Sequence, residues 1–177
     1  MSPPRILIAG IGNIFLGDDA FGVEVVRRLA AGPLSAGVVA IDFGIRGFDL
    51  ASAIVGGYDA VILVDAAPRG RPAGTVYVID VDLETLRALA TGPVEGHALN
   101  PERVLQWVGE WGERVPPCRL VGCEPARFGS DENPQMGLSA QVAGAVEQAL
   151  QMIHALIEEF SSARAFSSKM VDAAGRA

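Results

Sequence analysis

The sequence is poor in the residues that disulfides, nucleic-acid binding and membrane insertion require. Its only cysteines, Cys118 and Cys123, are five positions apart on or beside a predicted strand and so point to opposite faces; we expect two buried thiols and no disulfide. Lys169 is the only lysine, and the net charge of -7 argues against a nucleic-acid partner. No apolar run is long enough to span a bilayer, and no secretory signal is visible. We therefore expect a soluble, cytoplasmic protein that binds neither nucleic acid nor membranes.

The first part of the chain alternates between short apolar runs and helical patterns. Its 177 residues, 50% of them hydrophobic, suffice for one domain with a core. Runs typical of strands buried on both faces lie at 5–9, 38–42 and 60–64, and helical spacing lies at 21–31 and 48–55. This β-α-β-α-β order predicts a parallel sheet with helices on both faces.

The rest of the chain predicts two further strands and three helices, the first of them at 83–90. The strand-like segment 75–79 follows a loop too short for a crossover helix, so we expect it to run antiparallel at an edge. Another short strand is expected at 120–123. Asn100 followed by Pro101 marks the start of one helix, and Ser139 can cap the last one.

Together these elements predict a three-layer α/β/α domain. Its sheet is mostly parallel and twisted, with about five strands, one of them antiparallel at an edge. The apolar pattern of the last helix decays after Ser161 into Ser, Ala and Gly. We therefore expect a single catalytic domain over 1–163 and a flexible tail at 164–177.

Several acidic residues and one histidine lie near the predicted carboxyl edge of the sheet. In open α/β sheets, ligands bind beyond the carboxyl ends of the strands. Asp19 and Asp65 follow parallel strands, and so do Asp42 and Glu124. His97 lies in a loop that the topology should return to the same side.

Two aspartates and one imidazole in this place could hold a divalent transition metal. Asp19, Asp65 and His97 would supply two oxygens and one nitrogen, a set that suits zinc, nickel, manganese or iron. Three protein ligands leave coordination positions free for water or a substrate. The rival chemistry is a carboxylate pair, Asp19 with Asp65, that shares one proton as in aspartic proteases. The residues fit both.

Each of these residues also has a purely structural interpretation. Asp18 is expected to cap the helix that follows, which leaves the second acid of its pair for a cation. Asp65 could be a buried acid held by loop amides. Asp42 could pair with Arg46 or shape the turn. Taken alone, His97 is more often a surface histidine than a ligand.

The Gly10-Ile11-Gly12 turn invites a nucleotide-binding interpretation. The dinucleotide fingerprint requires a third glycine at position 15, where Phe15 stands. The two adjacent aspartates at the start of the next helix would repel a phosphate. Asp42 does occupy the place of a ribose-binding acid. The turn alone is therefore weak support for a cofactor.

These motifs, in this order and spacing, resemble the hydrogenase maturation endopeptidases. The resemblance covers about residues 5–160. It departs from the common pattern at Ala20, which replaces a glycine, and at Asp19, where some members have glutamate. The matching segments are Gly10 to Asp19 with Gly22, Asp42 to Gly47, Val61 to Ala66, and Val121 to Pro125 with Gly137 to Ser139.

The resemblance implies a set of site residues. The second acid of the opening motif, the acid that ends the buried strand and the histidine before a helix are metal ligands in the family. They fall on Asp19, Asp65 and His97. Candidates for the residues around these ligands are Asn13, Asp18, Asp42 and Glu124.

The resemblance also implies a reaction. The family removes a C-terminal extension from the nickel-loaded large subunit of nickel-iron hydrogenases. Nickel in the substrate is the recognition handle, so no tightly bound cofactor is expected, and zinc or cadmium could substitute in vitro. Attack by water polarised by nickel, or activated by a carboxylate base, both fit. The alternatives are a nucleotide-binding oxidoreductase that uses the Gly10-Gly12 turn and a non-enzymatic metalloprotein chaperone.

Overall fold

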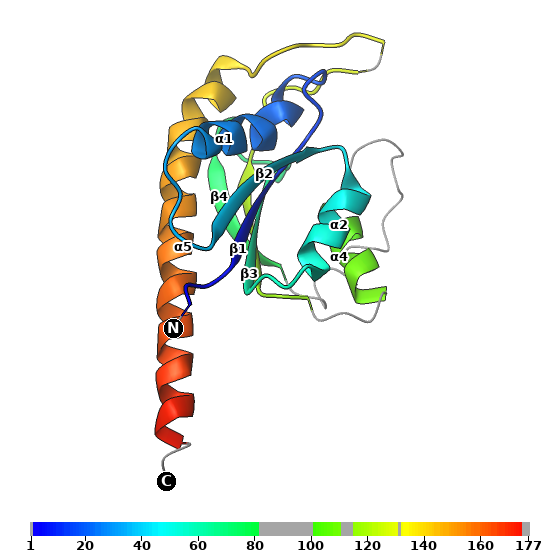
Figure 1. Cartoon of the computed structure of the whole chain (residues 1–177). Coiled ribbons are helices and arrows are strands. Elements are labelled where there is room, and N and C mark those ends of the chain that lie inside the picture. Colours follow the sequence, from blue (N-terminus) through cyan, green and yellow to red (C-terminus); the bar gives the residue numbers. More distant parts are fainter. Residues whose placement is uncertain (1, 82–100, 111–114, 131, 175–177) are drawn as a thin grey trace.

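The structure, a computed structural model, describes residues 2–81, 101–110, 115–130 and 132–174 and contains one five-stranded sheet between two layers of helices (Figure 1). The strands are β1 (Ile6–Ile11), β2 (Val38–Gly44), β3 (Ala60–Ala66), β4 (Val76–Val81) and β5 (Cys118–Cys123). The helices are the short 3-10 helix η1 (Asp18–Ala20), α1 (Phe21–Ala30), α2 (Gly47–Val55), α4 (Pro101–Glu110) and α5 (Ala140–Ala174). This is the three-layer α/β/α architecture that the sequence predicts.

Four strands of the sheet run parallel, and the fifth runs antiparallel at an edge. The strand order is β2-β1-β3-β5-β4, and only the pairing of β4 with β5 is antiparallel. The chain between Ala66 and Val76 is too short to hold a crossover helix, which explains this reversal. The predicted edge strand is confirmed. As a result, the carboxyl ends of the four parallel strands lie together at one edge of the sheet.

Successive strand residues face two separate cores. Ile6 of β1 packs on the side covered by α1 and α5, whereas Leu7 packs on the side covered by α2 and α4. The same alternation places Cys118 in the second core and Cys123 in the first. Both cysteines are buried and free, which confirms the prediction of unpaired thiols on opposite faces. Burial raises the pKa of each thiol to about 12.

Glycines allow the start of α1 to lie almost in contact with the sheet. Gly12 has a φ of 133°, and a Cβ there would lie 1.7 Å from the carbonyl oxygen of Asp19. A Cβ on Gly22 would lie 2.0 Å from the carbonyl oxygen of Val64 in β3, and one on Gly10 would lie 2.5 Å from the carbonyl oxygen of Gly22. The Gly10-x-Gly12 pattern therefore serves close packing of backbone against backbone.

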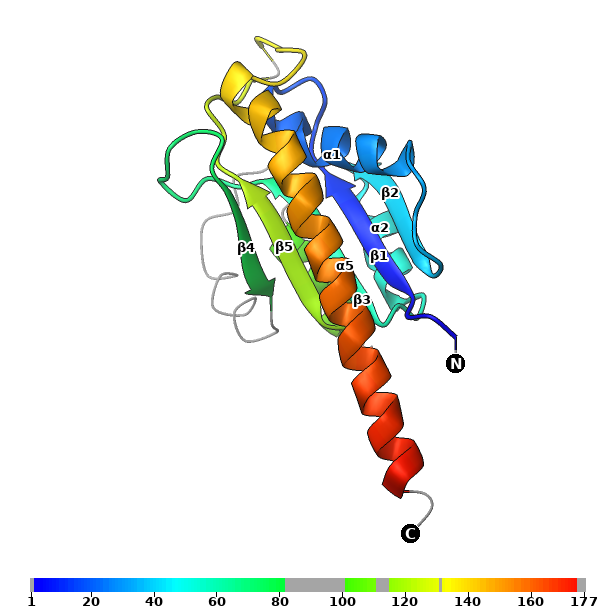
Figure 2. The ribbon, with the colours of Figure 1, turned by 90° about the vertical axis from the view of Figure 1, so that its left-hand side faces the viewer.

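Helix α5 is the longest element of the described chain. Ser139 caps it as predicted, because its Oγ accepts the Val142 N–H at 3.4 Å. Figure 2 shows α5 crossing one face of the sheet and continuing past its end. The backbone stays helical to Ala174, beyond the predicted domain boundary at residue 163, and the flexible tail stays a prediction. Neither α5 nor any other helix in the described ranges is long and apolar enough to cross a membrane.

The close approach at Gly12 generates a stability prediction. Gly12→Ala should lower the free energy of unfolding by at least about 3 kcal/mol, because it combines a strained φ with a steric clash. Gly144→Ala is the matched control: it lies in α5, its added Cβ meets nothing within 4 Å, and alanine should stabilise the helix by about 0.5–1 kcal/mol. Urea denaturation measures both changes. Equal stability of the Gly12→Ala variant and the wild type would contradict the packing described above.

Candidate functional site

Asp19 and Asp65 lie together at the carboxyl edge of the sheet. Asp19 belongs to η1, which follows β1, and Asp65 is the last residue but one of β3, the strand that pairs with β1. The negative charge of Asp19 helps to raise the pKa of Asp65, so the two carboxylates are close enough to repel each other. The predicted convergence of these two acids is therefore a feature of the fold.

Asp65 is the more buried of the two. Its exposed fraction is 7%, and burial is the main cause that raises its pKa well above the usual value, followed by the charge of Asp19. The N–H of Ala66 donates to Oδ1 at 2.9 Å and lowers the pKa only in part. One backbone donor does not offset both effects, so the pKa of Asp65 stays raised and ionisation of this carboxyl group costs free energy.

Asp19 is partly exposed, and its position is fixed by the loop before it. The N–H of Asn13 donates to Oδ2 of Asp19 at 2.6 Å. Burial raises the pKa of Asp19, and this hydrogen bond acts in the opposite direction. Asn13 thus touches the candidate site, as the sequence suggests.

The prediction that Asp18 caps the following helix is wrong. Neither η1 nor α1 has a side-chain cap, and Asp18 is instead fully buried. Its carboxylate accepts the N–H groups of Ala126 and Arg127 and both the N–H and the hydroxyl of Ser139, at 2.6–3.0 Å. Burial alone would raise the pKa of Asp18, but these donors lower it below the usual value. The charge also lies at the amino end of α5, where a helix dipole favours it.

Asp42 has a different partner from the one expected. Its carboxylate pairs with Arg27 of α1 at 2.9 Å, and Arg46 donates instead to the main-chain carbonyls of Asp42 and Phe43. The pairing with Arg46 through the carboxylate is therefore wrong. No local sequence signal indicates the contact between Asp42 and Arg27, because it joins two elements that only the tertiary fold brings together.

Glu124 is the buried acid held by loop amides. Its carboxylate accepts the N–H of Arg69 at 2.7 Å and that of Gly70 at 3.1 Å. Burial acts to raise its pKa, but the backbone donors of Arg69, Arg71 and Gly70 lower it below the usual value. Asp65, for which the sequence allows the same role of a buried acid held by loop amides, accepts only the N–H of Ala66 among the described residues. Glu124 shapes the loop after β3 and has its hydrogen-bonding capacity engaged there.

His97 lies outside the described residues, so its approach to the two aspartates stays a prediction. Among the residues that the structure does describe, no three His, Cys, Asp or Glu side chains are grouped closely enough to hold a metal ion. The described part of the site is thus a pair of carboxylates, to which a third ligand from the rest of the chain would have to be added.

Two carboxylates beyond the carboxyl ends of parallel strands lie where α/β proteins bind their ligands, so the fold and the pair place the chain among α/β proteins with a candidate active site at this edge. The model of the hydrogenase maturation protease family HycI matches residues 23–156. The chain is 32% identical to the hydrogenase 2 maturation protease of Escherichia coli, over 88% of this chain and 92% of that one. It is also 32% identical to the hydrogenase expression/formation protein HupD of Rhizobium leguminosarum, over 84% and 71%.

A solved structure shares the fold. The hydrogenase maturating endopeptidase HybD from E. coli superposes with a TM-score of 0.74 at 32% identity, covering 88% of this chain and 93% of that one. The chain belongs to the hydrogenase maturation protease family and is a peptidase that acts in hydrogenase maturation. The role of this family is C-terminal cleavage of the hydrogenase large subunit. The oxidoreductase and chaperone alternatives are therefore set aside.

Replacement of Asp18 should destabilise the fold in a pH-dependent way. Asp18→Asn replaces one acceptor oxygen with a donor that faces buried N–H groups, so it should lower the free energy of unfolding by about 2–4 kcal/mol at pH 7. Since the folded state lowers the pKa of Asp18, this contribution is present above about pH 4 and is lost as pH falls through the folded pKa. Asp49→Asn, at an exposed position on α2, is the control. Urea denaturation at several pH values measures both variants. Equal free energies of unfolding for Asp18→Asn and Asp49→Asn at pH 7 would contradict the role of Asp18.

Asp65→Asn should stabilise the protein at neutral pH. The folded state raises the pKa of Asp65, so its ionisation costs stability as pH rises through the folded pKa, and asparagine avoids that cost. A gain of about 1 kcal/mol would raise the Tm by roughly 2–4 °C at pH 8 in a chain of this size. The gain should vanish toward pH 4, where the wild-type carboxyl is also neutral. A Tm of Asp65→Asn at pH 8 equal to or below that of the wild type would contradict the conclusion that the fold disfavours ionisation of Asp65.

Proposed function

We propose that Asp19, Asp65 and His97 contact the nickel of a hydrogenase large-subunit precursor while its C-terminal extension is cut. The observation that carries this proposal is the difference between the acids at the carboxyl edge. The carboxylate of Asp42 forms an ion pair with Arg27, and those of Asp18 and Glu124 accept hydrogen bonds from backbone N–H groups. In the described part of the chain, neither Asp19 nor Asp65 forms an ion pair.

A divalent cation would relieve the repulsion between these carboxylates. Two like charges in a partly buried place disfavour ionisation, and a metal ion reverses that preference. Carboxylate oxygens and an imidazole suit nickel, and zinc or cadmium should substitute in vitro. Because the nickel arrives with the substrate, we expect no tightly bound cofactor in the free protease.

The position of α4 supports the third ligand. Only a short connection joins Glu110 to Cys118 at the amino end of β5. Because α4 precedes β5 and packs beside α2 on one face of the sheet, we expect it to run antiparallel to β5, with its amino end at Pro101 toward the carboxyl edge. His97 lies four positions before Pro101, the first residue of α4, so we expect its imidazole to reach that edge.

The peptide bond is cut by water in this proposal. Nickel in the substrate polarises the attacking water or the scissile carbonyl group. Asp19, the more exposed carboxylate, is the one we assign to accept a proton from the water. Asp65 and His97 hold the nickel in place. The partner is the nickel-loaded large subunit of a nickel-iron hydrogenase, in the cytoplasm.

Processing of this precursor tests the proposal. Nickel-loaded precursor from the same organism is incubated with enzyme, and mass spectrometry follows loss of the extension. Asp19→Asn, Asp65→Asn and His97→Ala should each slow cleavage by about 10²-fold or more, as expected for groups that act on the reacting centre. Nickel-free precursor should not be cut.

Two control variants separate chemistry from folding. His154→Ala removes the other histidine and Glu158→Gln removes an acid, both at exposed positions of α5. Both should process at the wild-type rate. Full processing by all three site variants, or equal cleavage of nickel-free precursor, would rule the proposal out. Binding of the precursor without any cleavage by the wild type would instead favour a chaperone.

A further inference from the structure

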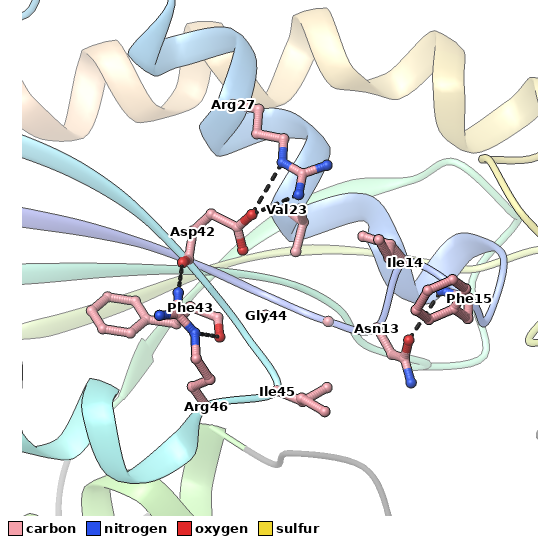
Figure 3. Close-up of a pocket in the computed structure, with 11 residues that line it drawn as sticks. Asn13, Ile14, Phe15, Val23, Arg27, Asp42, Phe43, Gly44, Ile45 and Arg46 are labelled. Atoms are coloured by element: carbon pink, nitrogen blue, oxygen red, sulfur yellow. Dashed lines mark hydrogen bonds and ion pairs between the residues drawn. The ribbon is translucent and has the colours of Figure 1, made fainter.

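A small pocket lies beside the loop that holds Asp19 through the N–H of Asn13. It opens between the loop 12–15 after β1, the first turns of α1, and the segment 42–46 where β2 leads into α2 (Figure 3). Its volume is about 330 Å³. This is at the small end of the roughly 300–1,000 Å³ that ligand pockets span, so it suits one or two side chains.

The pocket is largely apolar, and its rim holds two exposed hydrophobic side chains. Phe15 is 54% exposed and Ile45 is 60% exposed, on two different loops at the mouth. Ile14, Val23 and Phe43 also line it. Large apolar groups left in water beside a hollow gain free energy when an apolar partner covers them.

The charged groups of the pocket are already neutralised. Asp42 pairs with Arg27 at 2.9 Å. The guanidinium of Arg46 donates to the carbonyl oxygen of Phe43 at 3.1 Å and lies 3.7 Å from Asp49. A charged side chain entering the pocket would lose part of its hydration and would have to compete with these existing partners. The lining therefore selects a neutral, apolar side chain.

Asn13 joins the pocket to the candidate catalytic site. Its main-chain N–H donates to Asp19, and its side-chain Oδ1 accepts the N–H of Phe15 at 3.0 Å. That arrangement leaves Nδ2 of Asn13 to donate to a peptide carbonyl group. Neighbouring strands lie about 4.8 Å apart, and an extended peptide advances about 3.3 Å per residue. A side chain roughly one to three positions from the scissile bond can therefore reach this pocket, which lies beyond the carboxyl ends of β1 and β2.

We propose that this pocket is a specificity subsite that binds a neutral apolar side chain of the precursor, one to three residues from the bond that is cut. Phe15 and Ile45 close over that side chain, and Asn13 holds the adjacent backbone. The proposal rests on the proposed function, since it assigns the pocket to the same substrate.

Truncation of the rim tests the proposal. Phe15→Ala and Ile45→Ala should each raise the KM for nickel-loaded precursor about 5- to 20-fold, from the loss of buried apolar area, with kcat within about twofold of wild type. Val39→Ala on β2 and Val78→Ala on β4 are matched controls, because each is 40% exposed and lies outside the pocket. The controls should leave KM unchanged.

A double-mutant cycle identifies the occupant. Precursors are made in which each residue within three positions on either side of the cut is replaced by Asp, one at a time. At one apolar position the replacement should reduce kcat/KM of the wild type strongly and that of Ile45→Ala at least about threefold less, since contacting residues are not additive. Additive effects at every position would overturn the proposal, as would unchanged KM in both rim variants.

A measurement of precursor binding tests the subsite independently of the proposed function. Titration of each enzyme with nickel-loaded precursor at low temperature gives a Kd without requiring cleavage. If the wild type binds the precursor but does not cut it, the proposed function fails, and the ratio of Kd values for Ile45→Ala and wild type still decides the subsite. A ratio of about 5 or more supports it, and a ratio of one overturns it.

Discussion

The organisation of the site depends on the repulsion between two carboxylates, Asp19 and Asp65, that the fold holds close together. A folded protein rarely keeps like charges adjacent and partly buried without a counterion, because ionisation then costs free energy. Here the arrangement is enforced by backbone packing, since Gly12 and Gly22 bring η1 and α1 directly against β1 and β3. Packing of the backbone alone therefore brings the two carboxylates together.

The surrounding acids support this pair without sharing its role. Asp18 ties the start of α1 to the loop before α5, and Glu124 ties the end of β5 to the loop after β3. Their carboxylates are satisfied by N–H donors, which hold them ionised and fixed in position. Asp18 and Asp19 are adjacent in the sequence but differ in their surroundings: Asp18 is buried and held by four hydrogen-bond donors, whereas Asp19 is partly exposed and is the residue we propose for the reaction.

Much of the fold, and the proximity of Asp19 and Asp65, could be predicted from the sequence. Buried apolar runs, the short link before β4 and the caps at Pro101 and Ser139 are local signals, and they gave the architecture. The partners of Asp18 and Asp42 could not be predicted, because each contact joins segments that only packing brings together. The pocket rim was also missed. Its one available signal was a large apolar residue, Phe15 or Ile45, in an otherwise polar or glycine-rich turn.

The most direct test of this account is a crystal structure of the protein soaked with cadmium, which gives a strong anomalous signal and accepts carboxylate and imidazole ligands. We expect one dominant peak within about 2.5 Å of a carboxylate oxygen from both Asp19 and Asp65, with the imidazole of His97 as the third ligand. A peak elsewhere, or a cadmium ion that touches neither carboxylate while the pair is accessible, would contradict the central claim.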